Sequence, residues 1–212
     1  MNTGAMPMFP LGGVLFPGQL LPLHVFEPRY QQMLDHCLAG EREFGVVLIE
    51  QGGEVGGGDV RAQIGTVASI LDTSEVMPGH WALMTVGLRR IRVRQWHRDD
   101  PWPNADVADL LDEPVDVESL ATRWAEVQSD FRRIRALADR LAGGESGAVE
   151  YADDPVTGSF HLAALSPLGA FDRQRVLASV GVEHRLDVLG RVFGEIEETL
   201  LAQLAFGGQL DL

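Results

Sequence analysis

The most informative absence in this 212-residue sequence is lysine, because all 17 basic residues are arginine. Several reaction mechanisms depend on a lysine amine. A phosphate-binding P-loop needs one, and so do a Schiff-base enzyme and a hydrolase with a Ser-Lys dyad. The sequence therefore excludes these three kinds of active site.

Cysteine and long apolar runs are also scarce. Cys37 is the single cysteine, so the chain forms no internal disulfide, which is typical of a reducing compartment. No apolar run reaches the ~20 residues that span a bilayer, and prolines interrupt the apolar N-terminal stretch, which also has no basic segment before it. We expect a cytoplasmic protein that has no signal peptide and does not contact membranes.

Acidic residues outnumber basic ones, and the net charge is −14. A chain with this charge repels phosphate backbones unless basic residues cluster locally. One such cluster exists, between Arg89 and Arg98. Arg90, Arg92 and Arg94 alternate there with Ile91 and Val93, so on a strand the three arginines share one face. RNA binding by this face is the alternative hypothesis, although an exposed strand face paired with acidic neighbours is the more ordinary interpretation.

Signatures of catalytic and metal sites are missing from the sequence. It contains neither Gly-x-Ser-x-Gly nor HExxH, and its six histidines are scattered. Ser159 and His161 lie close in sequence, but both fall in an amphipathic helical pattern that favours a structural role. We therefore predict no catalytic residues, no metal site and no cofactor, and a small hydrolase of unrecognised type stays as the weakest alternative.

The first half of the sequence has β-strand patterns and one early helix. Tyr30, Met33, Leu34 and Cys37 repeat at helical spacing and predict a helix over Pro28–Leu38. Gln51–Asp59 contains five glycines and predicts a loop or hairpin tip. Apolar and β-branched runs predict strands over Leu20–Phe26, Phe44–Glu50, Ile64–Leu71, Ala82–Trp96 and Val107–Leu111.

The second half has helical patterns. Trp124, Val127, Phe131, Ile134, Leu137 and Leu141 form a stripe along one predicted helix. Four helices are predicted, over Ser119–Leu141, Val156–Leu165, Asp172–Ser179 and Val182–Phe206. Asp154 followed by Pro155 is typical of a helix start. The sequence therefore predicts an α+β protein, with a β-rich subdomain over residues 1–115 and a helical bundle over residues 116–212.

The N-terminal block from Met8 to Tyr30 is rich in proline and phenylalanine. Proline lacks an N–H and fixes φ, so these prolines punctuate short edge strands and turns, and Pro28 suits the first turn of a helix. The motif Met-Phe-Pro-Leu-Gly-Gly-Val-Leu-Phe-Pro-Gly, followed by Leu-Pro-Leu-His-Val-Phe-Glu-Pro-Arg-Tyr, resembles the opening of the Lon protease N-terminal (substrate-binding) domain family. Further segments resemble that family in its order: Phe44–Ile49, Ile64–Ile70, Val86–Val93, Asp100–Val107, Leu165–Leu177 and Val182–Leu186.

The resemblance implies a PUA-like β pseudo-barrel followed by a helical bundle. In Lon proteases this region precedes an ATPase and a peptidase module and is implicated in engaging unfolded or tagged protein substrates. Neither the ATP-binding lysine nor the Ser-Lys dyad of Lon exists in this sequence. We therefore expect a non-enzymatic protein- or peptide-recognition module that lacks those two modules. An adaptor role in protein quality control is the expected use of such a module.

The expected partners are unfolded or partly folded protein segments, together with an ATP-dependent protease or a chaperone. Apolar residues at turns are the candidates for contact, and a groove between the two subdomains is an expected location. For Phe16 and Phe26, core packing is favoured over direct contact. The candidate substrate-binding residues, all in the N-terminal block, are Phe16, Pro17, His24, Phe26, Arg29 and Tyr30.

Overall fold

The computed structural model describes residues 5–53, 58–144, 147 and 149–207. The chain divides into two compact units, Met1–Leu111 and Asp112–Leu212, where the sequence placed the boundary after residue 115. Each unit is described by itself. Part of the glycine-rich loop expected over Gln51–Asp59, residues 54–57, lies outside the described residues.

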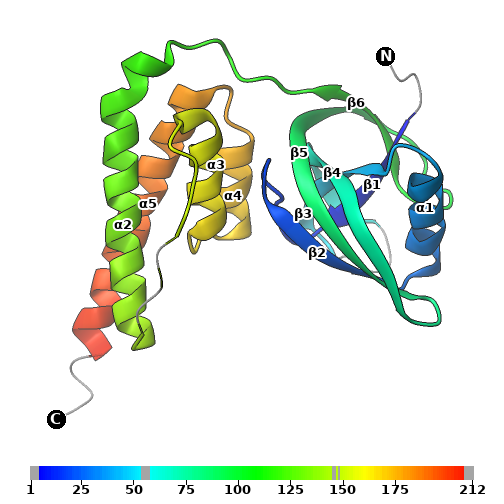
Figure 1. Cartoon of the computed structure of the whole chain (residues 1–212), viewed down its shortest axis with the longest axis horizontal. Coiled ribbons are helices and arrows are strands. Elements are labelled where there is room, and N and C mark those ends of the chain that lie inside the picture. Colours follow the sequence, from blue (N-terminus) through cyan, green and yellow to red (C-terminus); the bar gives the residue numbers. More distant parts are fainter. Residues whose placement is uncertain (1–4, 54–57, 145–146, 148, 208–212) are drawn as a thin grey trace. The chain divides into compact units, whose positions relative to one another are not determined.

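The first unit is a six-stranded sheet with one helix, α1 (Pro28–Ala39). The strand order is β2-β5-β4-β3-β1-β6, and β6 pairs with both β1 and β5, so that the sheet closes on itself (Figure 1). The strands are β1 (Met6–Leu11), β2 (Leu20–Val25), β3 (Glu43–Gln51), β4 (Val60–Met77), β5 (His80–Trp96) and β6 (Asn104–Asp109). Among the described residues β2 pairs with β5 alone, which makes it the edge strand.

Strand β1 differs from the sequence prediction, which assigned no strand to this proline-rich stretch. It pairs in parallel with β3, with Pro10 opposite Val47. The Met8 amide donates to Pro103 O on the other side of β1, so the Pro10 nitrogen faces that side as well. There β6 pairs with Met6 and Pro7 alone. Pro10 therefore occupies a position where its missing N–H removes no strand hydrogen bond.

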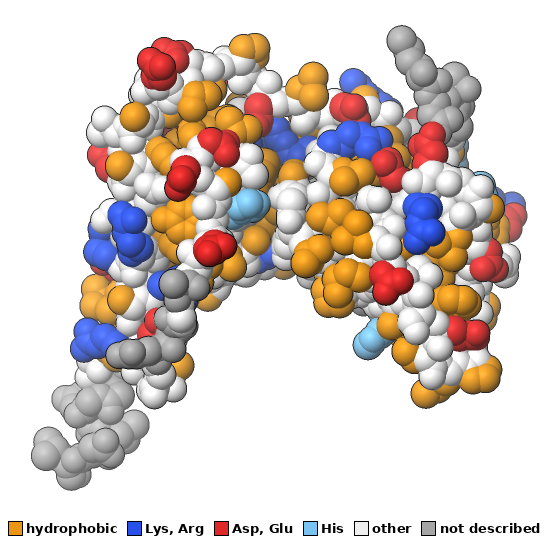
Figure 2. All heavy atoms as spheres, viewed as in Figure 1, with side chains coloured by type: hydrophobic (Ala, Val, Ile, Leu, Met, Phe, Trp, Pro, Cys, Tyr) orange, Lys and Arg blue, Asp and Glu red, His pale blue; other side chains and the backbone are white. Residues whose placement is uncertain are grey.

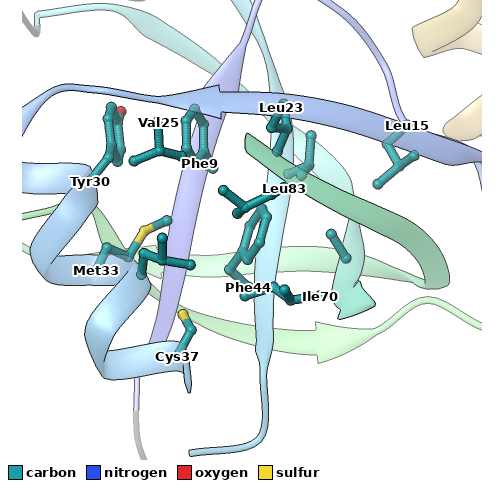
Figure 3. Packing of buried hydrophobic residues seen from close by; sticks show 13 residues of the cluster. Phe9, Leu15, Leu23, Val25, Tyr30, Met33, Cys37, Phe44, Ile70 and Leu83 are labelled. Carbon is teal, nitrogen blue, oxygen red and sulfur yellow. The ribbon is translucent and has the colours of Figure 1, made fainter. Parts of the chain in front are cut away.

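Strand β1 is buried on both of its faces. Met8 and Phe9 are neighbours in β1 but belong to different apolar clusters. The larger cluster joins α1 to the strands, and Figure 3 shows Tyr30, Met33 and Cys37 of α1 pointing toward the strand side chains. The predicted helical stripe is confirmed, since Tyr30, Met33, Leu34 and Cys37 are all buried.

The second unit contains a short 3-10 helix, η1 (Val117–Leu120), and four α-helices. These are α2 (Ala121–Ala142), α3 (Pro155–Leu165), α4 (Ala170–Leu177) and α5 (Val182–Gly207). The stripe predicted on α2 is buried from Trp124 to Leu137, but Leu141 is exposed. The Asp154 carboxylate accepts from the Thr157 amide and caps α3, with Pro155 at its first position. Both halves together give the predicted α+β class.

Candidate functional site

The edge strand β2 and its neighbour β5 expose an apolar surface. Alternate residues of β2 face outward, and the antiparallel register places Leu20 beside Val86 and Pro22 beside Met84. Leu20 is 57 % exposed and Met84 is 38 % exposed. We call this surface the β2–β5 face, and it consists of Leu20, Pro22, His24, Ala82, Met84 and Val86.

Large contiguous patches of exposed apolar surface are uncommon on soluble monomeric proteins. Figure 2 shows hydrophobic side chains gathered over the part of the first unit where β2 lies. An isolated exposed leucine needs no explanation, but paired apolar residues on two adjacent strands form a patch. The β2–β5 face is therefore a candidate surface for binding apolar groups.

A groove follows the other side of β2. It has a volume of about 180 Å³ and is lined by β1, β2 and the start of α1. Phe9 and Tyr30 stack there with ring centroids 4.2 Å apart, and Figure 3 shows the two rings side by side near Val25. Its lining residues are Phe9, Leu11, Pro22, Leu23, His24, Val25, Phe26, Glu27 and Tyr30. We call it the β2 groove.

The far end of β2 meets the β4–β5 hairpin. Phe26 is 52 % exposed and stacks on His80, with centroids 6.1 Å apart. The Gln31 side-chain amide donates to Phe26 O and to Gly79 O, at 2.8 Å each. These two bonds tie the hairpin turn to α1, so the exposed Phe26 ring is held at the end of the groove.

Charges at the start of α1 are paired. Arg29 Nε donates to Glu27 Oε2 at 3.0 Å, and the guanidinium lies over the Tyr30 ring, 4.5 Å from its centroid. Burial raises the pKa of Tyr30 to about 12, although the Arg29 charge opposes that shift. The phenol therefore stays neutral at physiological pH. Burial likewise raises the pKa of Cys37 to about 11, so its thiol is not a ready nucleophile.

Of the six candidate contact residues, the groove brings together His24, Phe26 and Tyr30. Arg29 is half-buried beside them, and Pro17 is half-buried in the turn that precedes β2. Their role in binding stays a proposal.

The candidate role of Phe16 as a contact residue is corrected, because its side chain is fully buried, as the favoured interpretation of core packing predicts. For Phe26 that interpretation is wrong, since its side chain is 52 % exposed. The turn containing Phe16 is fixed by short backbone contacts. The Gln19 amide donates to Phe16 O at 3.1 Å, and a Cβ at Gly87 would collide with the same carbonyl oxygen. Phe16 is therefore an anchor of the core beneath β2 and does not face the solvent.

The arginine face expected on β5 is also corrected. Arg92 and Arg94 are exposed, but Arg90 is 4 % exposed. A register shift lies between the pairs Thr66–Arg90 and Ala68–Gly87, which gives β5 one extra residue. This shift lies on the Gly87 side of Arg90, whereas Arg90, Ile91 and Arg92 pair with β4 in regular register, so the shift does not account for the burial of Arg90. The surface offers two of the three arginines required for the RNA hypothesis.

Ser159 and His161 do not form a catalytic pair. Ser159 is fully buried and its Oγ accepts from Arg185 Nε at 2.7 Å. His161 Nδ1 accepts a hydrogen bond from the Ala152 amide at 3.2 Å, which links α3 to the loop that precedes it. Across the part of the chain that the structure describes, no group of three or more His, Cys, Asp or Glu side chains can hold a metal ion.

Comparison with known proteins identifies the family of this chain. The family model described as the ATP-dependent protease La (Lon) substrate-binding domain matches residues 5–191. The chain belongs to the Lon substrate-binding domain family. This confirms the resemblance drawn from the N-terminal block.

Individual relatives are distant. The Lon protease of Desulfosudis oleivorans is 25 % identical over 193 residues, which are 88 % of this chain and 23 % of that protein. The Lon protease of Roseiflexus castenholzii is 30 % identical over 186 residues, which are 85 % of this chain and 23 % of that protein. The chain thus spans about a quarter of the length of these relatives.

The fold is confirmed by a solved structure, the Lon N-terminal domain protein from Xanthomonas campestris. It superposes with a TM-score of 0.63 at 27 % identity and covers 88 % of this chain and 96 % of that one. Among the described residues, no helix is both long and apolar enough to cross a membrane.

Proposed function

We propose that this chain recognises unfolded or partly folded polypeptide segments through the β2–β5 face and the β2 groove. The observation that carries the proposal is the contiguous exposed apolar surface on β2 and β5, which the β2 groove adjoins. Unfolded chains expose apolar side chains that native proteins bury, so a patch of this kind favours them as partners. Membership of a substrate-binding domain family supports the same function.

No chemical step is part of the proposal. The match is to a substrate-binding domain, and this sequence contains no lysine that could serve as the ATP-binding lysine or the Ser-Lys lysine of a Lon protease. We propose that the bound segments are passed to an ATP-dependent protease or a chaperone, which makes the chain an adaptor. Affinity in the micromolar range suits such transfer because it allows release.

Replacing Met84 with glutamate tests this function. The change places a charge at the centre of the β2–β5 face, where a bound apolar segment would have to desolvate it. We expect titration calorimetry with a carboxymethylated, permanently unfolded model protein to show micromolar binding by the wild type. The Met84→Glu variant should bind at least about tenfold more weakly, equivalent to about 1.4 kcal/mol.

Leu201→Glu is the matched control. Leu201 is 49 % exposed and lies on α5, in the other unit. Leu201→Glu and Met84→Glu each add one negative charge, so the two variants have the same net charge and repel the client equally. Equal affinities of the two variants, or no heat with the wild type, would contradict the proposed function.

A further inference from the structure

The backbone of β2 has one side turned away from the sheet. The Gly87 amide donates to Gln19 O at 2.9 Å, and Thr85 Oγ1 donates to Leu21 O at 2.8 Å. The backbone groups of these odd-numbered residues therefore point toward β5. In a strand the backbone groups of successive residues alternate in direction, so those of Leu20, Pro22 and His24 point away from β5.

This outward side lies between the β2–β5 face, which is apolar, and the β2 groove, whose lining is of mixed polarity. The β2–β5 face borders it on the side of the exposed residues, with Leu20 and Met84. The β2 groove borders it on the other side, with the stacked rings of Phe9 and Tyr30. Side chains of an added strand would alternate between these two surfaces, because successive residues of a strand point to opposite faces.

We propose that a client segment binds in an extended conformation as an additional strand paired with the free edge of β2. This inference rests on the proposed function and specifies how the client is held. Main-chain hydrogen bonds to Leu20, Pro22 O and His24 would supply affinity independent of client sequence. The β2–β5 face would then select segments with apolar side chains on one side, and the β2 groove would accept side chains of mixed polarity on the other.

The occupant is a client segment and not a second copy of this chain. Pro22 lies at the middle of the outward-facing positions and has no N–H to donate. In a symmetric antiparallel pair of two β2 strands centred there, each Pro22 would face the other and both central donors would be missing. A client strand loses one hydrogen bond at this place instead of two. Prolines on edge strands are a known protection against self-pairing.

N-methylation of a peptide tests the backbone pairing directly. The probe is the soluble peptide Arg-Thr-Val-Tyr-Val-Thr-Val-Arg-amide with a fluorophore attached to its N-terminal amine. It is titrated with the wild-type protein and followed by anisotropy. A strand presents alternate amides to its neighbour. One peptide is therefore methylated on its three valine nitrogens, a second on its two threonine nitrogens and its tyrosine nitrogen, and the affinities of the two are compared. We expect one set to lose at least about tenfold in affinity and the other to change less than about twofold.

Pro22→Val provides the second measurement. It keeps an apolar side chain on the face and adds the missing N–H to the free edge. We expect it to bind the unmethylated peptide about threefold to tenfold more tightly, which is the effect of one added backbone hydrogen bond. Its melting temperature and its sedimentation as a monomer show whether the variant is folded and unpaired.

The outcomes separate this inference from the proposed function. Equal effects of the two methylated sets, no binding of the peptide, or unchanged affinity of a folded Pro22→Val variant would overturn strand addition. Binding of the unfolded model protein, still weakened by Met84→Glu, would leave the proposed function standing in each case. Self-association of Pro22→Val without tighter peptide binding would assign the edge to a second copy and overturn the inference.

Discussion

Replacing Arg185 with alanine is expected to destabilise the second unit by about 3 kcal/mol. Its side chain is fully buried, and its guanidinium makes two hydrogen bonds to the Asp112 carboxylate, at 2.9 and 3.0 Å. It also donates to Ser159 Oγ at 2.7 Å and to Val156 O at 3.0 Å, and lies 3.9 Å from the centroid of the Phe160 ring. The substitution leaves all these acceptors without their donor.

The Asp112 side chain is 21 % exposed, so water can rehydrate part of its carboxylate after the substitution. For this reason we expect an effect near the lower end of the range for broken buried ion pairs. Urea unfolding followed by circular dichroism measures it. Arg191→Ala is the control, since Arg191 is exposed on the same helix and should change stability by less than about 0.5 kcal/mol. Equal losses in the two variants would contradict the account of Arg185.

Replacing Phe16 with alanine is expected to destabilise the first unit by about 3 to 5 kcal/mol, as for other fully buried phenylalanines. The phenyl ring is 0 % exposed, and its removal leaves a cavity below the turn that leads into β2. The same urea experiment measures this loss. At temperatures where the Phe16→Ala variant is fully folded, we expect it to bind the client as tightly as the wild type does.

Leu20→Ala is expected to leave stability unchanged and to weaken client binding, the opposite of what we expect for Phe16→Ala. Leu20 is 57 % exposed, so its truncation should change the free energy of unfolding by less than about 0.5 kcal/mol. Because it belongs to the β2–β5 face, the same variant should bind the unfolded model protein more weakly. A stable Phe16→Ala variant with impaired binding would restore Phe16 as a direct contact and contradict its place in the core.

The sequence was sufficient for the helices because their apolar periodicity is strong. The stripe of α1 and most of that of α2 are buried as predicted, and Asp154 with Pro155 starts α3. Strand β1 was missed because its prolines argue against a strand. Their tolerance depends on which side of β1 meets another strand, and that is a property of the tertiary structure.

The site was less predictable for a similar reason. The N-terminal block drew attention to the region of β2, but Phe16 is buried and Met84 was not considered. Met84 belongs to the β2–β5 face through its pairing with Pro22, and a pairing register between distant segments is not visible in one sequence. Arg90 lies in regular register with Arg92 and yet is 4 % exposed, so its burial was not visible in the alternation of the sequence. Arg185 lies at helical spacing from the buried Leu189 and Val192. This spacing was the signal in the sequence that could have predicted the burial of Arg185.

Mapping the bound client by amide chemical shifts tests the central claim most directly. The ¹⁵N-labelled protein would be titrated with the unlabelled, permanently unfolded model protein, and the shifted amides assigned. The account predicts changes concentrated in β2, the adjacent part of β5 and the start of α1, with slowed hydrogen exchange at the Leu20 and His24 amides. Changes confined to the second unit, or unaltered exchange at both amides with shifts elsewhere, would contradict recognition by β2.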